Sequence, residues 1–191
     1  MIQRLRQLLS QSPKRHIVDA NRVPAAVLVP LYDKLGQFYV LFTRRTEQVT
    51  EHKGQISFPG GAYEKDDRTL QHTALRECAE EIGLMAEDTE VLGELNDEVS
   101  LTSNYVISSF VALIPWPYKF KLNRAETEEI IEVPVSALLD KSCLRQETET
   151  LDGEEITSYF YHYQGRIIWG ATARILSQFL GFFVRVTGDK P

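Results

Sequence analysis

Arg76-Glu77-Cys78-Ala79-Glu80-Glu81-Ile82-Gly83-Leu84 is a short segment with the residue spacing of an amphipathic helix. A glycine directly after the last periodic position is typical of a helix end. We therefore expect a helix over residues 69–82 that stops at Gly83. Its core-facing stripe recurs at positions i, i+3, i+4 and i+7, formed by Leu75, Cys78, Ala79 and Ile82.

The three glutamates of this segment share a different face of the expected helix, because Glu77, Glu80 and Glu81 stand at i, i+3 and i+4. Each like-charge pair would destabilise an isolated helix by about 0.2–0.5 kcal/mol. A bound cation would offset this repulsion, and a cluster of carboxylate oxygens suits Mg²⁺ or Mn²⁺. The helix alone does not distinguish such a site from an ordinary solvated acidic face.

Composition limits the classes of partner. The chain has 191 residues, 43% of them hydrophobic, and a formal net charge of −6. These values fit one domain over residues 1–191 and disfavour nucleic acid, whose phosphates need a basic surface. An acidic site that receives anionic phosphates needs metal ions as intermediaries. The chain lacks a membrane-length apolar run, a secretory signal and a disulfide framework, so we expect a cytoplasmic protein with no membrane partner.

Apolar runs and turn residues predict an α/β (α+β) sandwich with a mixed central sheet. A helix at 2–10 lies in an N-terminal extension, 1–20, and an apolar helix at 170–185 ends the chain. That last helix either docks on the core or forms a homodimer interface. Residues 46–57 read as irregular, and Pro134 starts a short helix. Strands are expected at 23–31, 37–44, 91–95, 105–114, 126–133, 159–163 and 166–169, with an edge strand at 119–122 and a hairpin turn at Asp152-Gly153.

A glycine-rich entry, Phe58-Pro59-Gly60-Gly61, precedes the acidic helix. Adjacent glycines let the backbone approach a ligand closely and can free a carbonyl for coordination. The phosphate-binding motif that ends in Gly-Lys-Ser/Thr and the dinucleotide fingerprint are both absent. Alone, these glycines are more typical of a tight turn; together with the acidic helix they favour a site.

The two segments together resemble the Nudix hydrolase motif, G-x5-E-x7-R-E-U-x-E-E-x-G-U, in which U is a bulky apolar residue. Residues 76–84 match its second half. Gly61 precedes Arg76 by one residue more than the motif has, and Asp67, Asp66 or Glu64 stands for the motif's loop glutamate. The resemblance implies a Nudix-like α/β/α sandwich with the motif helix after the Gly-Gly loop. It also implies metal-dependent cleavage of a pyrophosphate bond in a small nucleoside diphosphate derivative.

The segment upstream of the helix is similar to a motif of the coenzyme A pyrophosphatase branch of that family. The motif of that branch is L-L-T-x-R-S-x3-R-x3-G-x3-F-P-G-G. Residues 41–46, Leu-Phe-Thr-Arg-Arg-Thr, stand at the matching distance, and Gly54 and residues 58–61 are in register. Thr50 occupies a position where the branch has arginine, and Lys53 lies close by. The resemblance implies coenzyme A or an acyl derivative as substrate. The alternatives are ADP-ribose or another dinucleotide, and a nucleotide sensor without catalysis.

Roles of individual residues follow from the resemblance. Glu77 and Glu81 would be the principal metal ligands, with Glu80 as a third ligand or the group that orients water. The Gly61 carbonyl would be a further ligand, and Arg76 would pair with a carboxylate of the site. Substrate contacts would come from Arg44, Arg45, Gly60 and Gly61. The general base stays open among Glu80, Glu94, Glu98, Glu126, Glu128, Glu129 and Glu132. His52 is a weaker candidate for a substrate contact.

Overall fold

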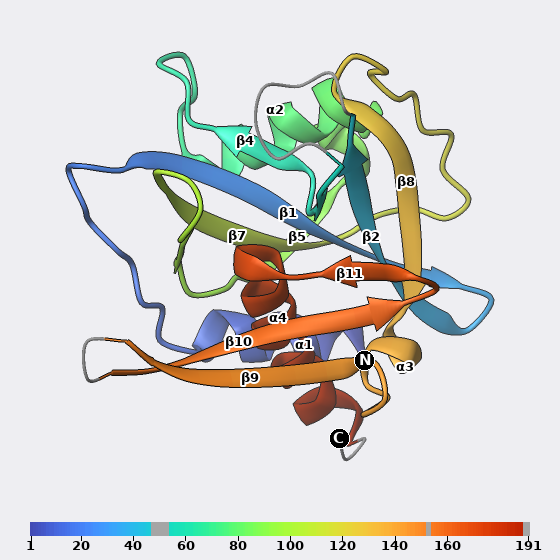
Figure 1. Ribbon diagram of the computed structural model, residues 1–191. Coiled ribbons are helices and arrows are strands. Elements are labelled where there is room, and N and C mark those ends of the chain that lie inside the picture. The colour runs from blue at the N-terminus through green and yellow to red at the C-terminus, as the bar shows by residue number, and fades with distance from the viewer. Residues whose placement is uncertain (47–53, 152–153, 189–191) are drawn as a thin grey trace.

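A mixed eight-stranded sheet lies between helix α2 on one side and a layer of helices and a small second sheet on the other (Figure 1). The computed structural model describes residues 1–46, 54–151 and 154–188. Strands β1 and β7 run parallel, and the other pairings are antiparallel. Five strands follow one another as hydrogen-bonded neighbours in the order β3 (Ile56–Ser57), β2 (Gln37–Arg45), β1 (Val23–Lys34), β7 (Tyr105–Leu113) and β5 (Glu90–Glu94). Three more strands pair with these: β4 (Gly60–Ala62) with β1, β6 (Glu98–Val99) with β7, and β8 (Thr127–Pro134) with β2.

Helix α2 (Leu70–Ile82) is the acidic helix that the sequence predicts, with the predicted limits. The Thr69 hydroxyl accepts a hydrogen bond from the backbone N–H of His72 at 3.1 Å and caps the first turn. Gly83 ends the helix with φ +68°. The apolar stripe packs on β1, β2 and β7, and its core comprises Ala74, Cys78, Ile82 and Leu84 against Leu28, Leu41 and Phe110.

The opposite face of the sheet carries the larger core. Helix α1 (Ile2–Gln11) packs on β5, and α4 (Gly170–Thr187) packs on α1 and β10. The apolar face of α4 therefore docks on the core, the first of its two alternatives, and a homodimer stays a prediction. A second antiparallel sheet of β9 (Leu144–Leu151), β10 (Glu154–Tyr163) and β11 (Arg166–Ile168) follows the short helix α3 (Val135–Leu138) and crosses in front of α4 and α1 in Figure 1.

The predicted sandwich with a mixed sheet is confirmed, but three local predictions need correction. Residues 119–122 form no strand. Instead the Lys121 N–H donates to the Ile82 carbonyl at 2.9 Å, so this segment satisfies the C-terminal end of α2. The predicted irregular segment 46–57 includes β3, and strands β9 and β10 extend well beyond the predicted 159–163. The predicted turn at residues 152–153 lies outside the described residues.

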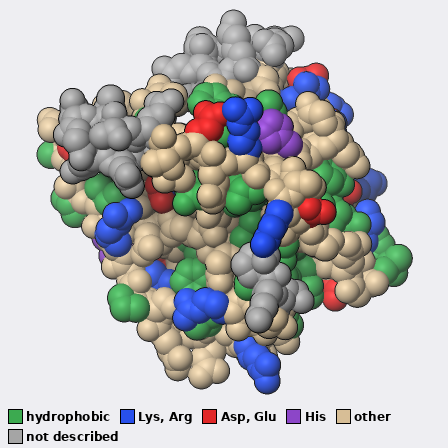
Figure 2. All heavy atoms as spheres, turned by 60° about the horizontal axis from the view of Figure 1, so that its bottom comes forward, with side chains coloured by type: hydrophobic (Ala, Val, Ile, Leu, Met, Phe, Trp, Pro, Cys, Tyr) green, Lys and Arg blue, Asp and Glu red, His purple; other side chains and the backbone are tan. Residues whose placement is uncertain are grey.

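The surface shows no gathering of basic side chains on the face drawn in Figure 2, where the coloured Lys and Arg side chains lie apart from one another. The described residues include no helix that is long and apolar enough to cross a membrane. A short 3-10 turn, η1 (Ala86–Asp88), connects α2 to β5.

Candidate active site

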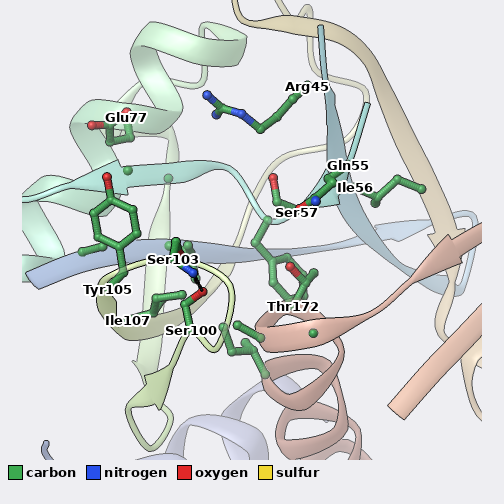
Figure 3. A pocket seen from close by; sticks show the side chains of 18 of the residues that line it. Arg45, Gln55, Ile56, Ser57, Glu77, Ser100, Ser103, Tyr105, Ile107 and Thr172 are labelled. Carbon is green, nitrogen blue, oxygen red and sulfur yellow. Dashed lines mark hydrogen bonds between the residues drawn. The ribbon is translucent and has the colours of Figure 1, made fainter. Parts of the chain in front are cut away.

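One cavity of about 330 Å³ brings together most of the predicted site residues (Figure 3). Strand β4 supplies Gly60 and Gly61, helix α2 supplies Glu77 and Glu81, and the end of β2 supplies Arg45. These segments meet because β4 pairs with β1 and α2 packs on both strands. The glycine-rich segment is thus a strand, and its alternative as a plain tight turn is wrong.

Close packing explains both glycines of β4. A Cβ at Gly60 would stand 2.3 Å from the Ala26 carbonyl oxygen, inside the pairing with β1. A Cβ at Gly61 would stand 2.5 Å from the Glu77 carboxyl carbon. The backbone of Gly61 therefore lies directly against the Glu77 carboxylate, an arrangement that a side chain would block.

Glu81 is the most unusual carboxylate of the cavity, because it is only 4% exposed. The backbone N–H of Gly60 lies near its carboxylate and lowers its pKa, and the Arg45 guanidinium Nη1 lies 3.7 Å from its Oε1. Its Oε2 is buried and has no hydrogen-bond partner among the described residues. Burial is the main cause that raises the pKa of Glu81 to about 8, with Glu77 and Glu126 adding to the effect against Arg45.

Glu77 is the second carboxylate, with a side chain 14% exposed. Burial raises its pKa, and the Arg76 guanidinium, whose Nη1 lies 2.9 Å from Glu77 Oε1, opposes that shift. Glu126, from the loop that enters β8, completes the acidic wall. Buried carboxylate oxygens without enough donors are the ligand chemistry that a hard divalent cation requires. The residues present therefore fit such an ion.

Arg76 holds the entry loop against the helix. Its Nε and Nη2 donate to the two oxygens of Asp67 at 3.0 and 3.1 Å, and Nη2 also donates to the Ala62 carbonyl. Asp67 is 4% exposed and also accepts from the Thr73 hydroxyl at 2.9 Å. The Arg76 guanidinium is the main cause that holds the Asp67 pKa well below its usual range. Of the three loop acids considered, Asp67 is the buried one and accepts two hydrogen bonds from the motif arginine, whereas the exposed Glu64 lies 3.8 Å from Arg76 Nη1.

Two predicted site residues, Glu80 and Arg44, do not line the cavity. The Glu80 side chain is 56% exposed, accepts from Arg76 Nη1 at 3.0 Å and does not line the cavity. Arg44 alternates with Arg45 along β2 and forms ion pairs with Glu128 and Glu129, both at 2.9 Å. Among the predicted substrate arginines, Arg45 is therefore the one that reaches the cavity. Thr50, His52 and Lys53 lie outside the described residues.

The seven candidates for the general base differ in whether they line the cavity. Glu126 lines the cavity, where its Oε1 accepts a hydrogen bond from Asn123 Nδ2 at 3.1 Å. The other six do not line it. Glu98 accepts from Arg174 and Gln178, Glu132 accepts from Tyr32, and Glu128 and Glu129 pair with Arg44.

Two parts of the cavity wall were not among the predicted site residues. One is the loop between β6 and β7, with Ser100, Thr102 and Ser103. The other is the start of α4, from Trp169 to Thr172, which joins the wall from the far end of the chain. Neither segment has charged residues, so residue type and spacing did not indicate that either one belongs to the site.

A second group of potential metal ligands lies outside the cavity. His16, Glu94 and Asp97 bring one ligand atom each to within 4.8 Å of one another, the one such group of three among the described residues. Asp97 is 3% exposed, but its Oδ1 accepts from the Ser108 hydroxyl at 2.7 Å and its Oδ2 from the Ile17 N–H at 2.8 Å. Asp97, the buried member of this group, is therefore satisfied by the protein itself.

The sandwich fold and the acidic cavity, together with the comparisons below, define a hydrolase that acts on pyrophosphate bonds. The chain belongs to the Nudix family: the family model described as NUDIX domain matches residues 22–160. A protein named uncharacterized Nudix hydrolase NudL, from Photorhabdus laumondii, is 36% identical over 172 residues, which cover 90% of each chain. Members of the family generally use divalent metal ions.

Two solved structures resemble the fold. The MutT/nudix family protein from Enterococcus faecalis gives a TM-score of 0.56 at 18% identity, covering 94% of this chain and 66% of that one. The NUDIX domain of Shewanella oneidensis NrtR, solved with ADP ribose, gives 0.50 at 21% identity over 64% of this chain and 78% of that one. At these identities the likeness concerns the fold alone.

Proposed function

We propose that the chain hydrolyses the pyrophosphate bond of coenzyme A or an acyl-coenzyme A with Mg²⁺ or Mn²⁺, producing 3′,5′-ADP and a phosphopantetheine. The observation that carries the metal-dependent chemistry is the buried Glu81 carboxylate, whose Oε2 has no partner among the described residues. Glu77 lies in the same cavity wall, and Gly61 presents its backbone at the Glu77 carboxylate. Glu77, Glu81 and the Gly61 carbonyl would hold the ion.

A bound divalent cation would supply positive charge to the phosphoryl oxygens and acidify water. Arg45 would bind non-bridging phosphate oxygens, since its guanidinium is the described cation of the cavity wall. We assign Glu126 as the group that takes a proton from the attacking water, because it is the base candidate in that wall. Water forms one new P–O bond, the bridging P–O bond breaks, and two phosphomonoesters result. Glu80 would act indirectly, by positioning Arg76.

The preference for coenzyme A rests on the motif at the end of β2. The arginine of this motif is Arg45, the residue that reaches the cavity. Residues 58–61, which belong to the same motif, lead into β4. ADP-ribose or another dinucleotide is the alternative substrate, and a catalytically inactive nucleotide sensor is the alternative of another class. A buried, unsatisfied Glu81 favours an enzyme, since a sensor has no need to retain it.

A substrate panel separates these three functions. Coenzyme A, acetyl-coenzyme A, ADP-ribose and a dinucleotide would each be incubated with Mg²⁺ or Mn²⁺, and products identified by mass. We expect the highest kcat/KM for coenzyme A or its acetyl ester. Faster cleavage of ADP-ribose would favour the alternative substrate, and inactivity of the wild type across the panel would refute both enzymatic functions.

The setting of this activity is part of the proposal. Cys78 and Cys143 are both buried and free. Free thiols fit a reducing compartment, and we propose the cytoplasm. Small nucleotides would be the partners, without nucleic acid or membrane. A homodimer stays a prediction that light scattering can test.

A further inference from the structure

A second cavity of about 450 Å³ adjoins the acidic one. The two share part of their walls, and together we call them the groove. At one end of this groove lie the carboxylates and Arg45, and at the other lie Val23 and Asn104. The shared wall consists of Gln55, Thr102, Ser103, Tyr105 and Trp169.

The two ends of the groove differ in charge. The acidic cavity is lined by Arg45, Glu77, Glu81 and Glu126, whereas the described residues that line the second cavity are all uncharged. A second phosphate or another charged group entering that end would lose water without gaining an opposite charge. The second cavity therefore suits an uncharged part of a ligand.

Hydrogen-bonding groups are available along the groove. The hydroxyls of Ser57, Tyr105 and Thr172 come from β3, β7 and α4, and none has a hydrogen bond to another described residue. In Figure 3 the Tyr105 hydroxyl points toward the side of the cavity that carries Glu77. Spaced polar groups from separate elements match a ligand whose own polar groups are spaced along a chain.

The loop that forms the shared wall is held in place before any ligand binds. The Ser103 hydroxyl donates to the Ser100 hydroxyl at 2.6 Å, and Arg22 Nη1 donates to the Ser100 carbonyl at 3.1 Å. The backbone N–H of Val23 donates to the Asn104 carbonyl at 2.8 Å. A wall fixed in this way can recognise a ligand without first losing loop entropy.

Trp169 supplies the largest apolar face of this wall and remains 37% exposed. It stands beyond residues 22–160, the part of the chain that matches the family model, directly before α4. A ligand that covers an exposed indole at a cavity removes a large apolar surface from water, which favours binding. The C-terminal segment thus adds a recognition surface to the family domain.

We propose that this groove receives the second substituent of the substrate as a long, uncharged arm with amide and hydroxyl groups, and that Trp169 determines this specificity. The proposal rests on the proposed function. It assigns the substrate class as a nucleoside diphosphate joined to a neutral flexible arm, and it disfavours a second charged nucleotide. Trp169 covers the apolar parts of the arm, and the hydroxyls of the groove bind its amides.

The experiment measures binding of the two halves of the substrate separately, by calorimetry on the full chain with Mg²⁺. The probes are 4′-phosphopantetheine, which contains the arm, and 3′,5′-ADP, which contains the nucleoside. We expect Trp169→Ala to weaken phosphopantetheine binding about tenfold and to change 3′,5′-ADP binding by less than about twofold. Trp116→Ala is the matched control, because Trp116 is also 37% exposed and lines neither cavity; it should change neither.

Thr102→Trp provides a second variant, since Thr102 is exposed and belongs to the shared wall, where added bulk fills the groove without disturbing the core. It should also weaken phosphopantetheine alone. Loss of 3′,5′-ADP binding instead, unchanged binding of both probes in both variants, or no phosphopantetheine binding by the wild type would overturn the proposal. Absence of hydrolysis with the expected binding pattern would refute the proposed function and leave the groove assignment intact.

Discussion

The chain contains two acidic clusters that differ in one respect. In the N-terminal cluster, His16, Glu94 and Asp97 converge within 4.8 Å, and Asp97 has a donor on each oxygen. In the cavity between α2 and β4, Glu81 Oε2 lacks a donor among the described residues. The proposed metal site is the cavity, because an unsatisfied buried oxygen that faces a cavity needs a cation more than ligand-type atoms that already have donors.

The largest expected effect comes from Glu81→Gln. This change removes a ligand charge in the cavity while preserving the shape of the side chain, so kcat should fall by about 10³-fold. Glu94→Gln is the matched change in the N-terminal cluster and should keep kcat within about twofold. Circular dichroism would verify the fold of both variants. Equal losses of activity would contradict the distinction between the clusters.

Gly61→Ala sharpens the comparison by moving a carboxylate without removing it. The new methyl group would stand 2.5 Å from the Glu77 carboxyl carbon, so Glu77 must shift. A misplacement of about 1 Å at a reacting centre lowers kcat/KM by about 100-fold, and we expect a loss of that order. Steady-state kinetics would measure it, with Gly181→Ala as the control, because a Cβ at Gly181 meets nothing within 4 Å. Wild-type kinetics in Gly61→Ala would show that Glu77 has no fixed role.

Glu126→Gln tests the proton acceptor. We expect kcat to fall by about 10²-fold, with KM little changed, because the carboxylate would act on water rather than on substrate. The control, Glu128→Gln, alters a neighbouring carboxylate that is paired with Arg44 and lies outside the cavity. A raised KM at unchanged kcat would assign Glu126 to substrate binding instead.

Asp67→Asn should affect stability more than catalysis, by on the order of 2–4 kcal/mol at pH 7. The folded protein holds the Asp67 pKa below its usual value of about 4, so the unfolded chain takes up the proton first as pH falls. The stability from Asp67 is present above about pH 4 and is lost below it. Urea unfolding should therefore show a wild-type advantage at pH 7 that narrows at pH 3. Asp66→Asn, an exposed neighbour, should show no such advantage.

Local sequence patterns predicted the α2 limits, the sandwich and most of the acidic wall. The stop at Gly83 and the apolar stripe are properties of one short segment, so spacing reveals them. The role of Thr69 as the cap, one residue before the helix, was not predicted. The sequence could not decide whether Asp67, Asp66 or Glu64 stands for the loop glutamate of the motif, because the three acids have nearly the same spacing from Arg76. Burial beside Arg76 and Thr73 distinguishes Asp67.

The remaining wall of the cavity depends on contacts between distant segments. Glu126 was one of seven comparable acids until β8 was placed beside β2. Trp169 and Thr172 reach the cavity because α4 packs back across the sheet, a tertiary arrangement without a local signature. Glu80 belongs to the motif, yet the turn of the helix directs it to Arg76 and to solvent.

Binding of Mn²⁺ to the purified chain, followed by electron paramagnetic resonance without substrate, tests the central claim most directly. We predict that Glu81→Gln weakens Mn²⁺ binding about 10–100-fold and that Glu94→Gln leaves it unchanged. Binding that survives Glu81→Gln and disappears in Glu94→Gln would contradict the account, because it would assign the metal to the N-terminal cluster.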